Sequence, residues 1–145
     1  MLKRCIRYGL WGIFLIVSLA LAGCASAAGA AGAAGGASTS LSVDMTDFAF
    51  KPATFTVPAG KEINVSVTNK GANVHEFVIM KLGTKVEPPF GDKDEGNIYW
   101  ELDDVQAGQT KTGKFTAPGP GTYQIVCGQP KHIEMGMVGS LTVTQ

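Results

Sequence analysis

A cysteine, a histidine and a methionine lie at short spacing near the end of this 145-residue chain. Four residues separate Cys127 from His132, and four more separate His132 from Met137. A thiolate, an imidazole and a thioether are all metal ligands, and a loop of this length can fold three of them around one ion. This part of the chain therefore indicates a metal site.

The only other histidine of the sequence, His75, supplies a fourth ligand of a suitable type. It lies in an apolar run at positions 74–79. Taken alone, such a histidine is more often a hydrogen-bonded residue of the core. Together with Cys127, His132 and Met137 it completes a His₂CysMet set, which indicates a ligand.

The four ligand types favour copper over zinc. A thiolate with two imidazoles and a weak axial thioether suits both Cu(I) and Cu(II), so little has to move when one electron arrives. A structural zinc site usually has four strong ligands and no thioether. Met135 is an alternative to Met137 as the axial ligand, but the strand phase and the Gly-Met-x-Gly context favour Met137. We therefore predict one copper ion and one-electron chemistry.

The first 23 residues have the pattern of a signal peptide. Three basic side chains precede an uncharged apolar run at 8–22, which is short for a membrane span of roughly 20 residues. The run ends in Leu21-Ala22-Gly23-Cys24, which resembles the lipobox of bacterial lipoproteins. We predict that Cys24 is lipidated; an uncleaved anchor and an ordinary signal peptide are the alternatives. Each of the three places the protein outside the cytoplasm, anchored to the cell membrane or facing the periplasm.

The remainder divides into a tether and one domain. Residues 25–40 contain only Ala, Gly, Ser and Thr, which bury too little apolar surface to offset the entropy of ordering. We therefore predict a flexible tether at 24–40, including Cys24, and a domain at 41–145.

The part of the chain after residue 24 is acidic. It has nine basic and 12 acidic side chains, which give a formal charge of −3, and this charge argues against a nucleic-acid partner. Six of the acids fall between Asp92 and Asp104, either as a docking surface for a basic partner or as a solvated loop.

Cysteine usage supports the metal hypothesis. Of the three cysteines, Cys5 lies in the signal segment and Cys24 carries the predicted lipid. Cys127 is therefore alone in the domain and cannot form an intramolecular disulfide. An unpaired thiol in an oxidising compartment must be buried or bound, and metal ligation is one way to bind it. A buried structural cysteine is the alternative.

Most of the domain alternates between apolar and polar residues, as half-buried strands do. The clearest runs are 62–68 and 140–144, and similar runs lie near 41–50, 53–57, 74–81, 110–116 and 121–127. Turn signals separate them, and the pattern predicts an all-β Greek-key sandwich of seven or eight strands. Within it Cys127 shares a strand face with Ile125, and Met137 is in phase with Leu141, so both ligands should point inward.

The stretch at 82–109 is longer than an ordinary hairpin loop. We expect a short helix or an irregular flap there. Trp100 within it is either an aromatic residue that caps the core, which we favour, or part of a partner surface.

Several short motifs resemble the cupredoxins over nearly all of 41–145. They are Phe50-Lys51-Pro52, Val57-Pro58-Ala59-Gly60, the turn from Asn69 to His75, Gly121-Thr122-Tyr123 and Gly136-Met137-Val138-Gly139. The ligand spacing is more similar to that of rusticyanin and sulfocyanin than to that of plastocyanin. The resemblance implies a type 1 (blue) copper site with His75, Cys127, His132 and Met137 as its ligands.

The resemblance also implies that His132 lies nearest the surface and forms the electron route. Pro130, Ile133 and Met135 would then form an apolar patch where a redox protein docks. Two residues depart from the pattern of many cupredoxins: Glu76 replaces an asparagine that ties the ligand loops together, and Lys131 replaces a glycine.

These observations favour a single-electron carrier between membrane-associated redox partners. A nitrite reductase or multicopper oxidase needs further copper ions held by more histidines, and none remain after His75 and His132, so we do not expect an enzyme. A periplasmic copper-binding or copper-delivery protein is the alternative.

Overall fold

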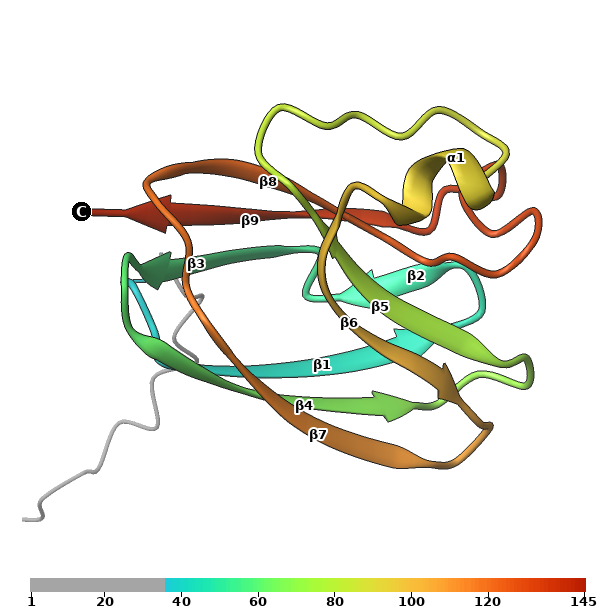
Figure 1. The fold of residues 1–145 in the computed structure, drawn as a ribbon. Helices are drawn as coiled ribbons and strands as arrows, with labels where there is room; N and C mark the ends of the chain where they lie inside the picture. Colours follow the sequence, from blue (N-terminus) through green and yellow to red (C-terminus); the bar gives the residue numbers. More distant parts are fainter. Residues whose placement is uncertain (1–35) are drawn as a thin grey trace, which may run out of the picture. The chain divides into compact units, whose positions relative to one another are not determined.

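Two β-sheets pack face to face in the computed structural model, which describes residues 36–145 (Figure 1). The four-stranded sheet has the order β2-β1-β4-β7 and contains β1 (Ser40–Thr46), β2 (Ala49–Lys51), β4 (Glu62–Asn69) and β7 (Thr110–Thr116). The five-stranded sheet has the order β3-β9-β8-β5-β6 and contains β3 (Thr54–Pro58), β5 (His75–Met80), β6 (Ile98–Val105), β8 (Gly121–Val126) and β9 (Val138–Thr144). The predicted all-β sandwich is confirmed, with nine strands among residues 36–145 in place of seven or eight.

The predicted signal peptide at 1–23, the lipidated Cys24 and most of the tether lie outside the described residues. Within 36–145 no helix is long and apolar enough to cross a membrane.

Alternation along the strands builds the main core between the sheets. In β4 the side chains of Ile63, Val65 and Val67 are buried, while the residues between them are exposed or half-buried. Parallel pairing of β1 with β4 and of β3 with β9 joins segments that are distant in the sequence. Each fully buried aliphatic side chain contributes about 1.5–3 kcal/mol to the free energy of folding, so the sheets form a rigid frame.

Strand β5 departs from the alternation because both of its faces are covered. Phe77 and Ile79 belong to the main core, whereas Val78 and Met80 pack in a second cluster. That cluster also contains Val86, Val126 and Ile133, with Phe90 and Ile98 against it. The strand that carries His75 is thus held from two sides.

The stretch at 82–109 was only partly predicted. It contains the expected short helix, α1 (Asp92–Glu95), but also strand β6, which the sequence pattern did not reveal. The pattern of β6 is weak because Trp100 and Leu102 are only half-buried, and Glu101 between them is exposed. Trp100 packs against the main core, with its ring centroid 5.2 Å from that of Phe115, as expected for a capping aromatic.

Candidate metal centre

Three neighbouring strands of the five-stranded sheet bring the predicted ligands to one end of the sandwich. His75 is the first residue of β5, Cys127 follows β8 directly and Met137 precedes β9 directly. Strand β8 pairs with both β5 and β9. The loop at 127–137 joins β8 to β9 and carries His132, so all four residues lie where these strands and this loop meet.

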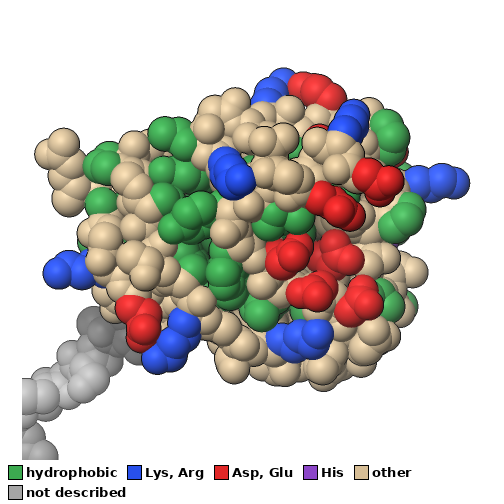
Figure 2. All heavy atoms as spheres, in the orientation of Figure 1, with side chains coloured by type: hydrophobic (Ala, Val, Ile, Leu, Met, Phe, Trp, Pro, Cys, Tyr) green, Lys and Arg blue, Asp and Glu red, His purple; other side chains and the backbone are tan. Residues whose placement is uncertain are grey.

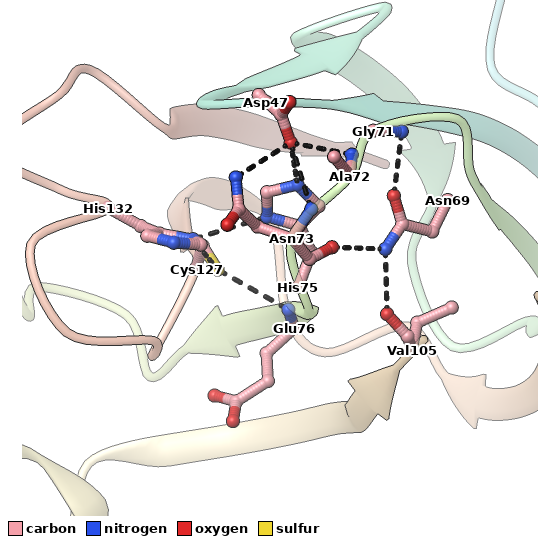
Figure 3. Close-up of polar contacts among 10 residues, drawn as sticks. All are labelled: Asp47, Asn69, Gly71, Ala72, Asn73, His75, Glu76, Val105, Cys127 and His132. Carbon is pink, nitrogen blue, oxygen red and sulfur yellow. Dashed lines mark hydrogen bonds and ion pairs between the residues drawn. The ribbon is translucent and has the colours of Figure 1, made fainter. Parts of the chain in front are cut away.

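His75, Cys127 and His132 form a compact group of donor atoms (Figure 3). Nδ1 of His132 lies 3.2 Å from Nδ1 of His75 and 3.2 Å from Sγ of Cys127, and the three donor atoms lie within 4.8 Å of one another. His75 and Cys127 have no exposed surface and His132 is 8% exposed. The sequence prediction that these three side chains converge is confirmed.

The group has the dimensions of a metal site. Ligand atoms that are each roughly 2.0–2.3 Å from one ion lie about 3–4 Å from one another, and His132 Nδ1 lies 3.2 Å from both of the other donors. A thiolate and two imidazoles without a carboxylate suit a soft or borderline ion such as copper and do not suit Ca²⁺ or Mg²⁺. The residues present therefore fit one copper ion.

The two methionines near the site differ in burial. Met137 has no exposed surface, and its backbone is bonded to both flanking ligands: its N–H donates to the carbonyl of His132 at 2.9 Å, and its carbonyl accepts from the N–H of Cys127 at 3.3 Å. Met135 is 59% exposed. Burial thus favours Met137 over Met135 as a fourth ligand.

The ligand loop is fixed by successive backbone hydrogen bonds. The N–H of His132 donates to the carbonyl of Gln129 at 3.1 Å, and that of Met135 donates to the carbonyl of Lys131 at 3.1 Å. Lys131 has a φ of 69°, in the left-handed region that favours glycine. Lys131 is one of the two residues that depart from the pattern of many cupredoxins, which have glycine here. Its backbone nevertheless has a conformation that favours glycine.

Burial controls the ionisation of the cysteine and of the loop histidine. It raises the pKa of the Cys127 thiol to about 11, although backbone N–H groups of Glu76 and Gln129 stabilise the thiolate. The N–H of Glu76 lies 3.3 Å from Sγ. Burial also lowers the pKa of His132, as does the neighbouring His75. The His132 imidazole is therefore neutral near pH 7 and has a lone pair for a metal, whereas the thiol must lose its proton on binding.

Asn69 ties together the segments around His75 (Figure 3). Its side-chain amide donates to the carbonyls of Asn73 at 2.7 Å and Val105 at 2.8 Å, and its Oδ1 accepts from the N–H of Gly71 at 2.8 Å. The residue is fully buried. The turn from Asn69 to His75 is visible in the sequence, but the role of Asn69 is not; its only signal there is a polar residue at an inward-facing strand position.

Glu76 connects the same strand to the ligand loop. Its carboxylate accepts a hydrogen bond from Nε2 of Gln129 at 2.7 Å, and the same amide group lies 3.0 Å from Oδ1 of Asp104. Burial raises the pKa of Glu76, and the charges of Asp104, Glu101 and Asp103 raise it further. Glu76 thus links strand β5 to the ligand loop at the position where many cupredoxins have an asparagine.

Comparison with known proteins agrees with this geometry. The family model of the cupredoxin-like domain matches residues 13–143. Reduced auracyanin from Roseiflexus castenholzii is similar in structure, with a TM-score of 0.67 and 34% identity over 76% of this chain and 100% of that one. Rusticyanin from Thiobacillus ferrooxidans shares the fold, with a TM-score of 0.57 and 22% identity over 74% of this chain and 79% of that one.

Among curated proteins, the copper-resistant cuproprotein CopI from Rubrivivax gelatinosus is 29% identical over 116 residues, which cover 74% of this chain and 67% of that one. The family match extends over far more than half of the sequence and includes every strand except the end of β9. The chain is therefore a member of the cupredoxin-like domain family.

Proposed function

We propose that this protein carries single electrons by means of one copper ion held by His75, Cys127 and His132. The observation that carries the proposal is the arrangement of the three donor atoms, buried and within 4.8 Å of one another. Copper supplies a Cu(II)/Cu(I) couple, and two imidazoles with one thiolate form a ligand set that both oxidation states accept. Met137 would be a fourth, weaker ligand, because it is buried and its backbone is hydrogen-bonded to both Cys127 and His132.

The protein around the ligands supports electron transfer by holding them in place. Cys127 accepts from the backbone of Glu76, and Asn69 fixes the segment that leads to His75. Strand β5 is packed on both faces. A frame of this kind limits the movement of the ligands between oxidation states, which favours rapid transfer of one electron.

His132 is the proposed route by which electrons enter and leave. It is the most exposed of the four residues, at 8%, whereas the other three have no exposed surface. Pro130 and the 59%-exposed Met135 lie in the same loop and offer apolar surface for a redox protein. Ile133 is only 8% exposed and packs in the second cluster, so it does not belong to such a patch.

Acidic side chains beside the site support a partner with a basic surface. Glu76, Glu101 and Asp103 line a groove together with Gly128, the residue after the cysteine. Figure 2 shows Asp and Glu side chains gathered on this face, over β6 and α1. Negative charge near an electron route accelerates the encounter with a positively charged protein.

An electron carrier fits the chain better than a copper enzyme. The sequence has two histidines in all, and the proposed site uses both. A catalytic centre with additional copper ions requires further imidazole ligands.

Copper binding for resistance or delivery is the second candidate, and the similarity to CopI favours it. The two functions differ in what the bound ion does. A carrier keeps its copper through repeated oxidation and reduction, whereas a delivery protein gives the ion up to an acceptor.

We also propose an extracytoplasmic location and an anchor through lipidated Cys24, on the basis of the sequence at 1–24. Labelling of cells with a radioactive fatty acid tests the anchor. Label on the wild-type protein and none on a Cys24→Ala variant supports it, and an unlabelled wild type contradicts it.

The electron-transfer proposal is tested by loading the purified domain with copper and titrating its potential. We expect one copper per chain and an intense visible band from the thiolate that bleaches and returns over several redox cycles. A Cys127→Ser variant should lack the band. A colourless complex, or loss of the ion on each reduction, would contradict an electron carrier.

A further inference from the structure

A two-residue turn between β1 and β2 contacts both histidines of the proposed site. Oδ1 of Asp47 lies 3.3 Å from Nε2 of His75. The ring of the next residue, Phe48, meets the ring of His132 edge-on, with centroids 5.1 Å apart and an interplanar angle of 87°. Asp47 therefore contacts the nitrogen of His75 that does not face His132, and Phe48 packs against the ring of His132.

Asp47 is held in position by the segment that precedes His75 (Figure 3). The same Oδ1 accepts from the backbone N–H groups of Ala72 at 3.0 Å and Asn73 at 3.2 Å, and from the Asn73 side-chain amide at 3.1 Å. An aspartate side chain is ionised at neutral pH, and its carboxylate can only accept hydrogen bonds.

This arrangement determines which nitrogen of His75 bears hydrogen. Because Asp47 offers no proton, the 3.3 Å contact requires Nε2 of His75 to donate. In a neutral imidazole the other nitrogen, Nδ1, then has a free lone pair. That nitrogen is the one that faces His132, at 3.2 Å.

Gly71 provides the space that this contact needs. A Cβ added at Gly71 would meet Oδ1 of Asp47, and it would lie 2.9 Å from the Asp47 nitrogen and 3.0 Å from Nε2 of His75. Any larger residue would push the carboxylate and the imidazole apart. The contact between Asp47 and His75 therefore depends on the absence of a side chain at Gly71.

The turn also adopts a costly backbone conformation. Phe48 has a φ of 66°, in the left-handed region that is unfavourable for residues other than glycine. Such conformations persist where the surrounding structure fixes them, and they cluster near functional sites. The residue with this conformation is the one whose ring contacts His132.

We propose that Asp47 is a positioning residue for His75, and that its carboxylate fixes the tautomer in which Nδ1 binds the metal and stabilises Cu(II) over Cu(I). The proposal rests on the function proposed above. A carboxylate behind a ligating imidazole makes the ligand a stronger donor. A negative charge close to the ion also favours the more positive oxidation state.

Three variants separate charge from geometry. Asp47→Asn removes the charge but keeps an oxygen that accepts from His75. Asp47→Ala removes both. Asp44→Asn is the matched control, because Asp44 lies on β1 three residues before Asp47, carries the same charge and pairs with Lys70 at 2.6 Å instead of with a histidine.

The first measurement needs no copper. In the metal-free protein, ¹⁵N NMR of the His75 ring should show hydrogen on Nε2 in the wild type, in Asp44→Asn and in Asp47→Asn, and a mixture of tautomers in Asp47→Ala. An unchanged tautomer in a folded Asp47→Ala protein would overturn the assignment of Asp47 as the residue that fixes the ring.

The second measurement is the copper potential. Loss of a partner of this kind weakens metal binding about 10–100-fold. A tenfold loss confined to Cu(II) raises a one-electron potential by about 59 mV. We expect a rise of at least this size in Asp47→Asn and a clearly smaller one in Asp44→Asn.

The two proposals fail in different ways. Equal shifts in Asp47→Asn and Asp44→Asn would overturn the role of the carboxylate, even in a protein that shows the copper band. Absence of the band in the wild type would instead refute the electron-transfer site, and the NMR result would still decide whether Asp47 fixes the ring of His75.

Discussion

Nδ1 of His75 lies 3.2 Å from Nδ1 of His132, although 57 positions of sequence separate the two residues. Strand β5 supplies the first and the loop between β8 and β9 supplies the second. Two imidazole nitrogens at this distance, with a thiol beside them, can share one ion. The function proposed here depends on this relationship.

The choice between the two methionines is tested by changing each to leucine. Leucine has a volume close to that of methionine, so either variant should fold, at a cost below about 1.5 kcal/mol. We expect Met137→Leu to alter the visible and paramagnetic spectra of the copper protein, because the buried thioether is lost. Met135→Leu, at a 59%-exposed position, serves as the control. A spectral change in Met135→Leu and none in Met137→Leu would identify Met135, not Met137, as the methionine ligand.

The conformation of Lys131 predicts an effect of glycine on stability. Because its φ is 69°, Lys131→Gly should relieve strain and raise the free energy of unfolding by up to about 1 kcal/mol, after the entropy cost of glycine. Lys61→Gly, at a turn residue without positive φ, should lower it. Denaturant unfolding of the metal-free proteins measures both. If Lys131→Gly lost as much stability as Lys61→Gly, the backbone at Lys131 would not be strained.

The buried thiol predicts a loss of stability in alkali. The Cys127 pKa is raised from 9.0 to about 11 in the folded protein, so the unfolded chain releases this proton first as the pH rises. The stabilisation relative to the unfolded chain is complete below pH 9 and is lost towards pH 11. Two pKa units correspond to about 2–3 kcal/mol.

This prediction is measured on the metal-free protein by unfolding at several pH values. Cys127→Ser has no thiol to ionise and should lose less stability over the same interval. If the free energy of unfolding fell equally with pH in both proteins, the raised pKa of Cys127 would be contradicted.

The acidic groove predicts a preference for cationic redox partners. Glu101→Gln combined with Asp103→Asn should slow oxidation of the reduced protein by tris(phenanthroline)cobalt(III), by about threefold to tenfold at low salt. The matched control is Asp44→Asn with Glu62→Gln, which removes the same charge from the other sheet.

Stopped-flow measurements at increasing salt test the electrostatic origin. The difference between the two double variants should shrink as the charges are screened, and oxidation by hexacyanoferrate(III) should not show the same slowing. Equal rates for both double variants at low salt would contradict a role of the groove.

Alternation of side chains made much of the fold predictable. The sandwich, the inward direction of Cys127 and the burial of Met137 all follow from strand parity and are seen in the structure. Strand β6 was missed because only one side chain in its eight residues, Val105, is fully buried. The run predicted at 41–50 is interrupted at Asp47 and Phe48, where Phe48 adopts a conformation that its residue type does not signal.

The candidate ligands were predictable because the sequence has two histidines and one cysteine in the domain. The residues around them were not. Asp47 and Asn69 act through three-dimensional contacts with segments at 71–75 and at Val105, and a polar residue at a turn is too common to indicate such a contact. Ile133 was expected at the surface, but it is buried in the second cluster, which includes Val86 and Phe90 from the stretch after β5.

X-ray absorption at the copper edge, recorded on the oxidised and the reduced protein, tests the central claim most directly. We expect one sulfur and two nitrogen ligands at roughly 2.0–2.3 Å from the ion, with little change between the two states. The sulfur signal should disappear in Cys127→Ser. A spectrum with only nitrogen and oxygen ligands in either state of the wild type would contradict a copper site built from His75, Cys127 and His132.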